Sequence, residues 1–186
     1  SYTTLGMTSG KFYCEVKIRE LQGTAVVGVS GRPNSDMIDN KNVGDTTQSA
    51  GYRSSGSSEI ASATASFGNS YTTNDIIGIA IDVDNSKLYF SKNGVWQNSG
   101  DPTSGSTGTG ALSMPVAAIS CTDGAYFFGF GDTSTGGSSA PKFSFNFGNG
   151  YFATTAVSSA GTNASGIGIF EYDVPTGYTA LSTKGL

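Results

Sequence analysis

The sequence predicts an all-β protein, built as an antiparallel two-sheet sandwich. Its clearest segment is 74–96, where apolar side chains recur at every second position, at Ile77, Ile79, Ile81 and Val83. The small residues between them, Gly78 and Ala80, predict a strand that is covered on both faces. The dipeptide Asn93-Gly94 then marks a two-residue hairpin turn, because both residues tolerate positive φ. Helical periodicity nowhere exceeds a turn or two.

Nine segments carry the alternation or the apolar run that is typical of strands. They are residues 11–19, 25–30, 60–67, 76–83, 87–92, 114–121, 125–130, 142–147 and a last one near 178–182. Asp84-Asn85-Ser86 supplies the turn between the fourth and fifth, since short Asx side chains cap their own backbone. The expected core consists of the inward-facing members: Phe12, Val16, Ile18, Val27, Ile77, Ile79, Ile81, Leu88, Phe90, Val116, Ile119, Phe145 and Phe147.

Length and composition predict one domain over residues 1–186, as a unit that a longer chain can contain. Charged residues make up 13% of the chain, against about 25% in ordinary domains. The formal net charge of −4 argues against nucleic acid as a partner, because such partners call for a basic face. No apolar run approaches the ~20 residues of a membrane span, so we expect no membrane insertion.

The residue inventory argues against catalysis and against bound metal. Without any histidine, a Ser-His-Asp triad and a Cys/His zinc site are both excluded. Cys14 and Cys121 are expected to be buried free thiols rather than a disulfide. Asp82 and Asp84 share a strand face at the entry to a turn, where capping explains them better than an acid–base pair. We therefore expect no enzyme activity, no cofactor and no metal.

The core segment "KLYFSKNGVW" and five other motifs, all in order along the chain, resemble those of the SPRY domain, the conserved half of B30.2 modules. They are "SGKFYCEV" at 9–16, "VGVS" at 27–30, "GYRSSG" at 51–56, "KLYFSKNGVW" at 87–96, "NFGNGYF" at 146–152 and "PTGYTAL" at 175–181. Cys14 departs from the pattern, since the family often has Trp or Phe there. The resemblance implies a concanavalin-like jelly roll whose partners are recognised by loops at one end.

Within that family the chain is most similar to SPRY-like domains in virion proteins of tailed bacteriophages. The likeness rests on the Gly/Ser/Thr/Asn-rich loops, on the core segment 71–96 and on the ending "FEYDVPTGYTALSTKGL" at 170–186. It implies a non-catalytic adhesion domain on a tail fibre or capsid-attached fibre of the extracellular particle. The partners so implied are a host-surface glycan or protein and other virion proteins, with the fibre itself a homo-oligomer.

Four side chains beside the polar loops are the candidates for ligand contact: Arg32, Tyr52, Arg53 and Trp96. Arginine forks bind carboxylates, and aromatic plates stack on sugars or fill peptide pockets. The contact surface is expected on loops 31–49 and 99–110, with a third polar loop at 131–140. The competing interpretation is that Tyr52 and Trp96 cover the end of the sandwich and that Arg53 makes a structural ion pair.

Two other functions remain open from the sequence. One is an architectural or decoration domain of the particle that binds no ligand. The other is an adaptor that binds short peptides in the cytoplasm, where animal SPRY domains accompany other modules. A lectin-like glycan hydrolase is disfavoured, because the chain's four glutamates lack the spacing of a catalytic carboxylate pair.

Overall fold

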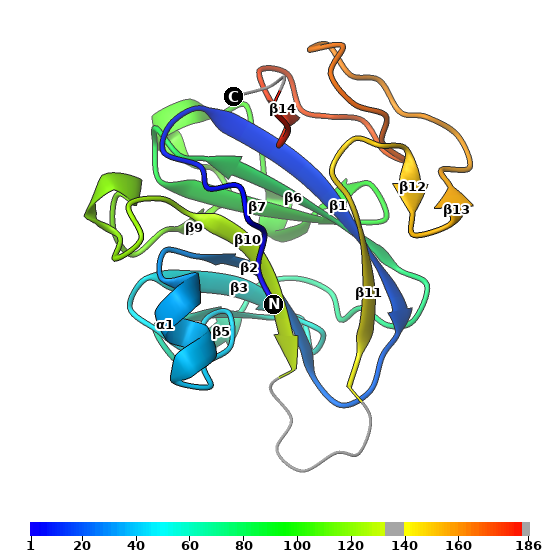
Figure 1. Cartoon of the computed structure of the whole chain (residues 1–186). Helices are drawn as coiled ribbons and strands as arrows, with labels where there is room; N and C mark the ends of the chain where they lie inside the picture. Colours follow the sequence, from blue (N-terminus) through cyan, green and yellow to red (C-terminus); the bar gives the residue numbers. More distant parts are fainter. Residues whose placement is uncertain (133–139, 184–186) are drawn as a thin grey trace.

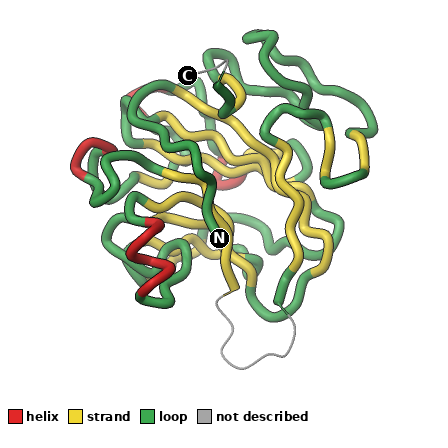
Figure 2. Tube along the Cα trace, in the orientation of Figure 1, coloured by secondary structure: helices red, strands yellow, loops and turns green. Residues whose placement is uncertain are grey.

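Two β-sheets packed face to face form the body of the protein, as the computed structural model shows for residues 1–132 and 140–183 (Figures 1 and 2). The larger sheet has seven strands along the order β11-β1-β6-β7-β8, with β14 beside β1 and β9 beside β7. Their bounds are β1 Lys11–Glu20, β6 Ile76–Asp82, β7 Lys87–Lys92, β8 Val95–Trp96, β9 Leu112–Ser113, β11 Lys142–Asn146 and β14 Thr179–Ala180. All pairings are antiparallel except that of β14 with β1.

The smaller sheet has five antiparallel strands in the order β10-β2-β3-β4-β5. Their bounds are β2 Ala25–Ser30, β3 Ser49–Arg53, β4 Ser57–Ile60, β5 Ala63–Ser66 and β10 Phe127–Asp132. A separate hairpin joins β12 (Tyr151–Phe152) to β13 (Thr155–Ala156). The helical elements are α1 (Pro33–Ile38) and three 3₁₀ turns, η1 (Gln97–Ser99), η2 (Gly105–Thr107) and η3 (Ala118–Ser120). The predicted antiparallel sandwich is confirmed.

The main core lies between the two sheets and contains most of the predicted side chains. Nine are at most 4% exposed: Phe12, Val16, Ile18, Val27, Ile77, Ile79, Ile81, Leu88 and Phe90. Val116, Phe145 and Phe147 are partly buried against that core. Cys14 and Cys121 are buried free thiols, as predicted.

A second apolar cluster covers the outer face of the larger sheet, so β6 is buried on both sides along its whole length. Tyr13, Ala80 and Tyr89 point outward from the sheet, and Phe170, Val174 and Tyr178 pack onto them. We call residues 157–178 the C-terminal strap, because they cross this face without forming a strand. The Glu15 carboxylate fixes the strap: it accepts the backbone N–H groups of Glu171 and Tyr172, each at 2.8 Å.

The structure corrects two of the predicted strands and contains others that were not predicted, among them β3. The segment 60–67 is split into β4 and β5 by a turn at Ala61 and Ser62, which both have positive φ. No strand runs through 114–121; this segment contains η3, and Ile119 is 86% exposed instead of buried. Strand β3 was not predicted, because its sequence, SAGYR, is short and its alternating apolar members are only Ala50 and Tyr52.

A row of glycines explains how the first long loop lies on the smaller sheet. Gly129, Gly28 and Gly51 are direct neighbours across β10, β2 and β3. Val43 is fully buried above this row, and a Cβ on Gly51 or on Gly129 would lie 3.0 Å from one of its methyl groups. Because only glycine leaves this space, the row anchors the loop between α1 and β3 to the outer face of the sheet.

Candidate functional site: the surface around helix α1

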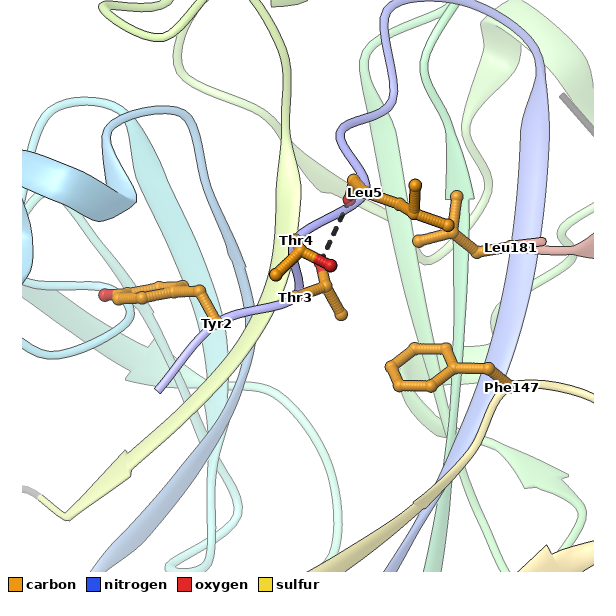
Figure 3. Close-up of a pocket in the computed structure, with 6 residues that line it drawn as sticks. All are labelled: Tyr2, Thr3, Thr4, Leu5, Phe147 and Leu181. Atoms are coloured by element: carbon orange, nitrogen blue, oxygen red, sulfur yellow. Dashed lines mark hydrogen bonds between the residues drawn. The ribbon is translucent and has the colours of Figure 1, made fainter. Parts of the chain in front are cut away.

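The N-terminal residues form an extra extended segment along β10 and separate two hollows. Thr3 donates its backbone N–H to Phe128 at 2.8 Å, and Met7 pairs in the same way with Tyr126. Figure 3 shows the hollow between the sheets, where Leu5, Leu181 and Phe147 point toward one another, while Tyr2 points away from them. This hollow of about 340 Å³ is mainly apolar, with Thr3 and Thr4 as its polar members.

The second hollow, of about 510 Å³, lies between the N-terminal segment and α1. Its wall consists of Tyr2, Thr3, Thr4, Pro33, Asn34, Met37, Asp123 and Phe127. Polar and apolar groups therefore face the same space. This combination is typical of a site that binds through apolar contacts and is oriented by a few polar groups.

Helix α1 begins where the sequence favours it, with Pro33 in the first turn and Asp36 close behind. Asp36 is fully buried and holds the helix in place. Its carboxylate accepts the hydroxyl of Ser30 at 2.6 Å and that of Tyr2 at 3.2 Å, and its other oxygen lies 3.0 Å from Nε of Arg32. Burial, together with the charge of Asp36, raises the pKa of Tyr2. The tyrosine is thus a neutral hydrogen-bond donor to the aspartate.

Three large apolar side chains are exposed at this end of the molecule. Met37 and Ile38 on α1 are 60% and 85% exposed, and Ile119 on η3 is 86% exposed. The two segments are tied together through Asp123, whose carboxylate lies 3.4 Å from the backbone N of Asn34 and whose own N–H donates to the Gly31 backbone at 3.1 Å. Asp123, four residues after Ile119, therefore lies beside the first turn of α1. We call Pro33, Asn34, Met37, Ile38, Ile119 and Asp123 the α1 surface.

Arg32 lies beside the α1 surface, but its guanidinium is engaged within its own loop. It contacts Asp36 and also makes a close ion pair with Asp39, and one quarter of its side chain is exposed. Arg32 therefore serves first to fix α1. Its exposed edge is all that it presents to a partner.

Tyr52 does not form an exposed aromatic plate. It is fully buried, with its ring centre 5.2–5.4 Å from those of Tyr71, Phe67 and Phe90. Its hydroxyl donates to the backbone oxygen of Asn69, and burial raises its pKa to about 12. The prediction of an accessible ring was wrong, because β3 directs this side chain into the space between the sheets.

Arg53 and Trp96 lie away from the α1 surface. Arg53 stands opposite Val26, at the other end of β2 from Arg32, and its guanidinium lies 3.3 Å from the carboxylate of Glu59. Trp96 is on β8 of the larger sheet, half-buried against the second cluster, and its ring forms a T-shaped pair with that of Tyr13. The four predicted site residues thus do not form one site.

The predicted loops are likewise not brought together as one surface. Loop 99–110 lies against the larger sheet, where Tyr178 donates its hydroxyl to the Pro102 backbone and the hydroxyls of Tyr89 and Ser104 are 3.2 Å apart. Loop 31–49 instead adjoins residues 117–124. Most of the loop predicted at 131–140 falls outside the described residues.

The sequence reasoning missed the apolar members of the α1 surface. A signal for α1 was present, because Pro33 followed by Asp36 is the usual start of a helix. Ile119 gave a misleading signal, since the apolar run around it is equally compatible with a strand. Asp123 had no sequence signal, because its position depends on the contact between two distant loops.

The described residues contain no group of three or more His, Cys, Asp or Glu side chains placed to hold a metal ion. Among the helices in these parts of the chain, none is long and apolar enough to cross a membrane.

Comparison with known proteins identifies the domain. The profile of the SPRY domain matches residues 11–126, from the start of β1 to the residue before β10. A curated relative, the "Probable ATP-dependent RNA helicase ddx1" of Dictyostelium discoideum, is 33% identical over 91 residues. That alignment covers 49% of this chain and 11% of the relative, so the similarity concerns a small part of the larger protein. SPRY domains are in general protein-interaction modules, and this chain belongs to the SPRY domain family.

Proposed function

We propose that this protein is a non-catalytic recognition domain that binds a protein partner at the α1 surface. The observation that carries the proposal is the hollow of about 510 Å³ beside α1, next to exposed Met37 and Ile38. Exposed apolar groups around a concave site are typical of surfaces that bind proteins. Asp123 gives the site one polar group with which to orient the bound segment.

The same geometry favours a protein over a glycan. Sugar faces stack on aromatic rings. Tyr52 is buried, and Trp96 is half-buried in the second cluster. The two rings that line the hollow, Tyr2 and Phe127, are only partly exposed, so neither offers a free plate there. Aliphatic side chains such as those of Met37 and Ile119 are suited instead to apolar side chains of a peptide.

We further propose that the domain is displayed on the particle of a tailed bacteriophage, as part of a fibre. The support is the phage-like ending at 170–186, the low charge of 13% and the many hydrogen-bonding loop residues. Its partners would be a host-surface protein and other virion proteins, in a homo-oligomeric fibre. Many weak sites on one particle would together give firm attachment. The alternative location is the cytoplasm, where the same surface would bind a short peptide as an adaptor.

The test is a random-peptide display library selected on the immobilised domain, followed by affinity measurements with the selected peptides. A Met37→Ser/Ile119→Ser double variant should weaken binding at least about tenfold, as expected for the loss of central apolar contacts. The matched control is Val95→Ser/Ile169→Ser, which removes two side chains of similar exposure, 66% and 52%, elsewhere on the domain.

Equal loss in both double variants, or none in either, would contradict the α1 surface as the site. Failure to select any peptide would favour the architectural role. Antibodies against the domain that fail to decorate particles of the encoding phage in electron micrographs would contradict the virion location, and would leave the peptide result unaffected.

A further inference from the structure

The edges of the two sheets differ in how they are protected. Along β10 the N-terminal residues pair with the strand through Thr3 and Met7. On β11 the edge carries Lys142, in an ion pair with Glu20. Strand β8 is only two residues long. Covering segments, edge lysines and very short strands are the usual means of preventing unwanted strand pairing.

Strand β5 has neither a cover nor a charge. Its four residues, Ala63 to Ser66, are all exposed, and it forms the last strand of the smaller sheet. Within residues 1–132 and 140–183, no segment other than β4 pairs with it. Its side chains are small and uncharged, so the backbone at this edge is accessible.

The hairpin register shows which backbone groups point away from the sheet. Ile60 and Ala63 flank the two-residue turn, so they and the pair Ser58–Ala65 exchange hydrogen bonds within the hairpin. Thr64 and Ser66 stand opposite Glu59 and Ser57 at the positions between, which direct their N–H and C=O groups outward. Two donors and two acceptors therefore line the free edge, one of each on Thr64 and one of each on Ser66, with Ala65 between them.

We propose that this edge pairs with β5 of a second copy of the same domain, so that the two five-stranded sheets join into one. An antiparallel pairing centred on Ala65 places Thr64 opposite Ser66 of the second copy, and Ser66 opposite Thr64. Each outward donor then meets an outward acceptor, which gives four backbone hydrogen bonds about a two-fold axis. Such an interface is isologous, the usual form of protein dimers.

Charge supports a second copy as the occupant. The chain carries a net charge of −4, so two copies repel each other over most surfaces. At β5 no ionisable side chain lies on either partner, and identical strands meet without opposed like charges. The pairing uses backbone groups of β5 and none of the residues of the α1 surface, so it does not depend on the function proposed there.

The interface is small. Stable protein pairs bury more than about 1,000 Å² in total, which a four-residue edge does not reach by itself. The contact is therefore expected to be weak between isolated domains. It becomes effective where several copies are held close together, because their effective concentration is then millimolar.

The experiment is sedimentation velocity of the purified 186-residue chain over a concentration series that reaches the millimolar range. A reversible monomer–dimer equilibrium is expected. Thr64→Pro deletes the outward N–H of each copy and is compatible with an edge strand, so it should weaken dimerisation about tenfold or more. Thr64→Lys places a like charge on both partners and should do the same. The matched control, Thr155→Lys on exposed β13, adds the same charge elsewhere and should leave the dimer intact.

Amide hydrogen exchange gives an independent check. The N–H groups of Thr64 and Ser66 should exchange more slowly at high concentration, and this protection should vanish in Thr64→Lys. A domain that stays monomeric at millimolar concentration would overturn the proposal. So would a dimer that both Thr64 variants leave unchanged. If one of the two Thr64 variants melts well below the wild type, the conclusion rests on the other Thr64 variant.

Discussion

Replacing Glu15 by alanine should release the C-terminal strap while the sandwich stays folded. Glu15 is fully buried on the outer face of β1. One carboxylate oxygen accepts the Tyr172 N–H at 2.8 Å and the Tyr13 hydroxyl at 3.2 Å. The other accepts the Glu171 N–H at 2.8 Å and the Asn146 amide at 3.3 Å. Glu15→Ala leaves all four donors without this acceptor.

The magnitude follows from the two part-buried backbone amides that lose Glu15 as their acceptor. A buried donor that loses its partner costs about 1–3 kcal/mol, so the two together cost about 2–6 kcal/mol. The strap retains the packing of Phe170 and Tyr178, both 1% exposed, which does not depend on Glu15. We therefore expect local opening of residues 157–178 rather than global unfolding.

Hydrogen exchange followed residue by residue measures this opening. Protection of the Glu171 and Tyr172 amides should fall by more than about tenfold, while that of Ile79 in β6 stays near the wild-type value. The control is Glu20→Ala on the same strand, which removes an exposed ion pair with Lys142 and should have little effect. Unchanged protection of the Glu171 and Tyr172 amides would refute the assignment of Glu15 as the residue that fixes the strap.

Two further predictions concern the ends and the outer face of the sheets. Gly51→Ala should lower the free energy of unfolding by about 1–3 kcal/mol, because its Cβ would lie 2.6 Å from Val26 and 3.0 Å from Val43. Denaturant titrations should show that adding Val43→Ala relieves part of this loss. Strictly additive effects of the two substitutions would contradict the contact. Asp82 should contribute to acid sensitivity: burial alone would raise its pKa, but hydrogen bonds from Asn85 and Lys11 hold it below its ordinary value of 3.8. Because the pKa of Asp82 is lower in the folded than in the unfolded state, its ionised form stabilises the fold above pH 3.8, and this contribution is lost as the pH falls through the folded pKa. Asp82→Asn should flatten that part of the stability–pH curve. An unchanged curve would show that Asp82 is not responsible.

The strands at the centre of the larger sheet could be predicted because their pattern and their environment agree. In β6 every side chain is buried, and the two-sided burial follows from isoleucines alternating with Gly78 and Ala80. The turn at Asn93-Gly94 could be predicted for a similar local reason: Asn and Gly tolerate positive φ, and both residues have it in the structure. Where local chemistry alone decides the conformation, the sequence is sufficient.

The site could not be predicted in the same way, because it depends on contacts between distant segments. Tyr52 was assigned to the surface because β3 is too short to stand out as a strand: its only apolar members besides Gly51 are Ala50 and Tyr52, at alternate positions. Ile119 was assigned to the core because an apolar run does not distinguish a strand from an irregular segment that crosses the edge of a sheet. The ion pairs of Arg32 and Arg53 likewise depend on partners that only the folded chain brings near.

The anchoring of the first long loop separates positions that must keep their identity from positions that are free to vary. Asp36 and Val43 are both fully buried, one within α1 and the other above the glycine row, and they fix the loop at two points. Between and beside these points, Met37, Ile38 and Ile119 face solvent. A library that randomises these three positions should therefore yield folded domains with different binding preferences. The same arrangement would let a natural lineage change its partner through a few substitutions, without any change in the sandwich that carries them.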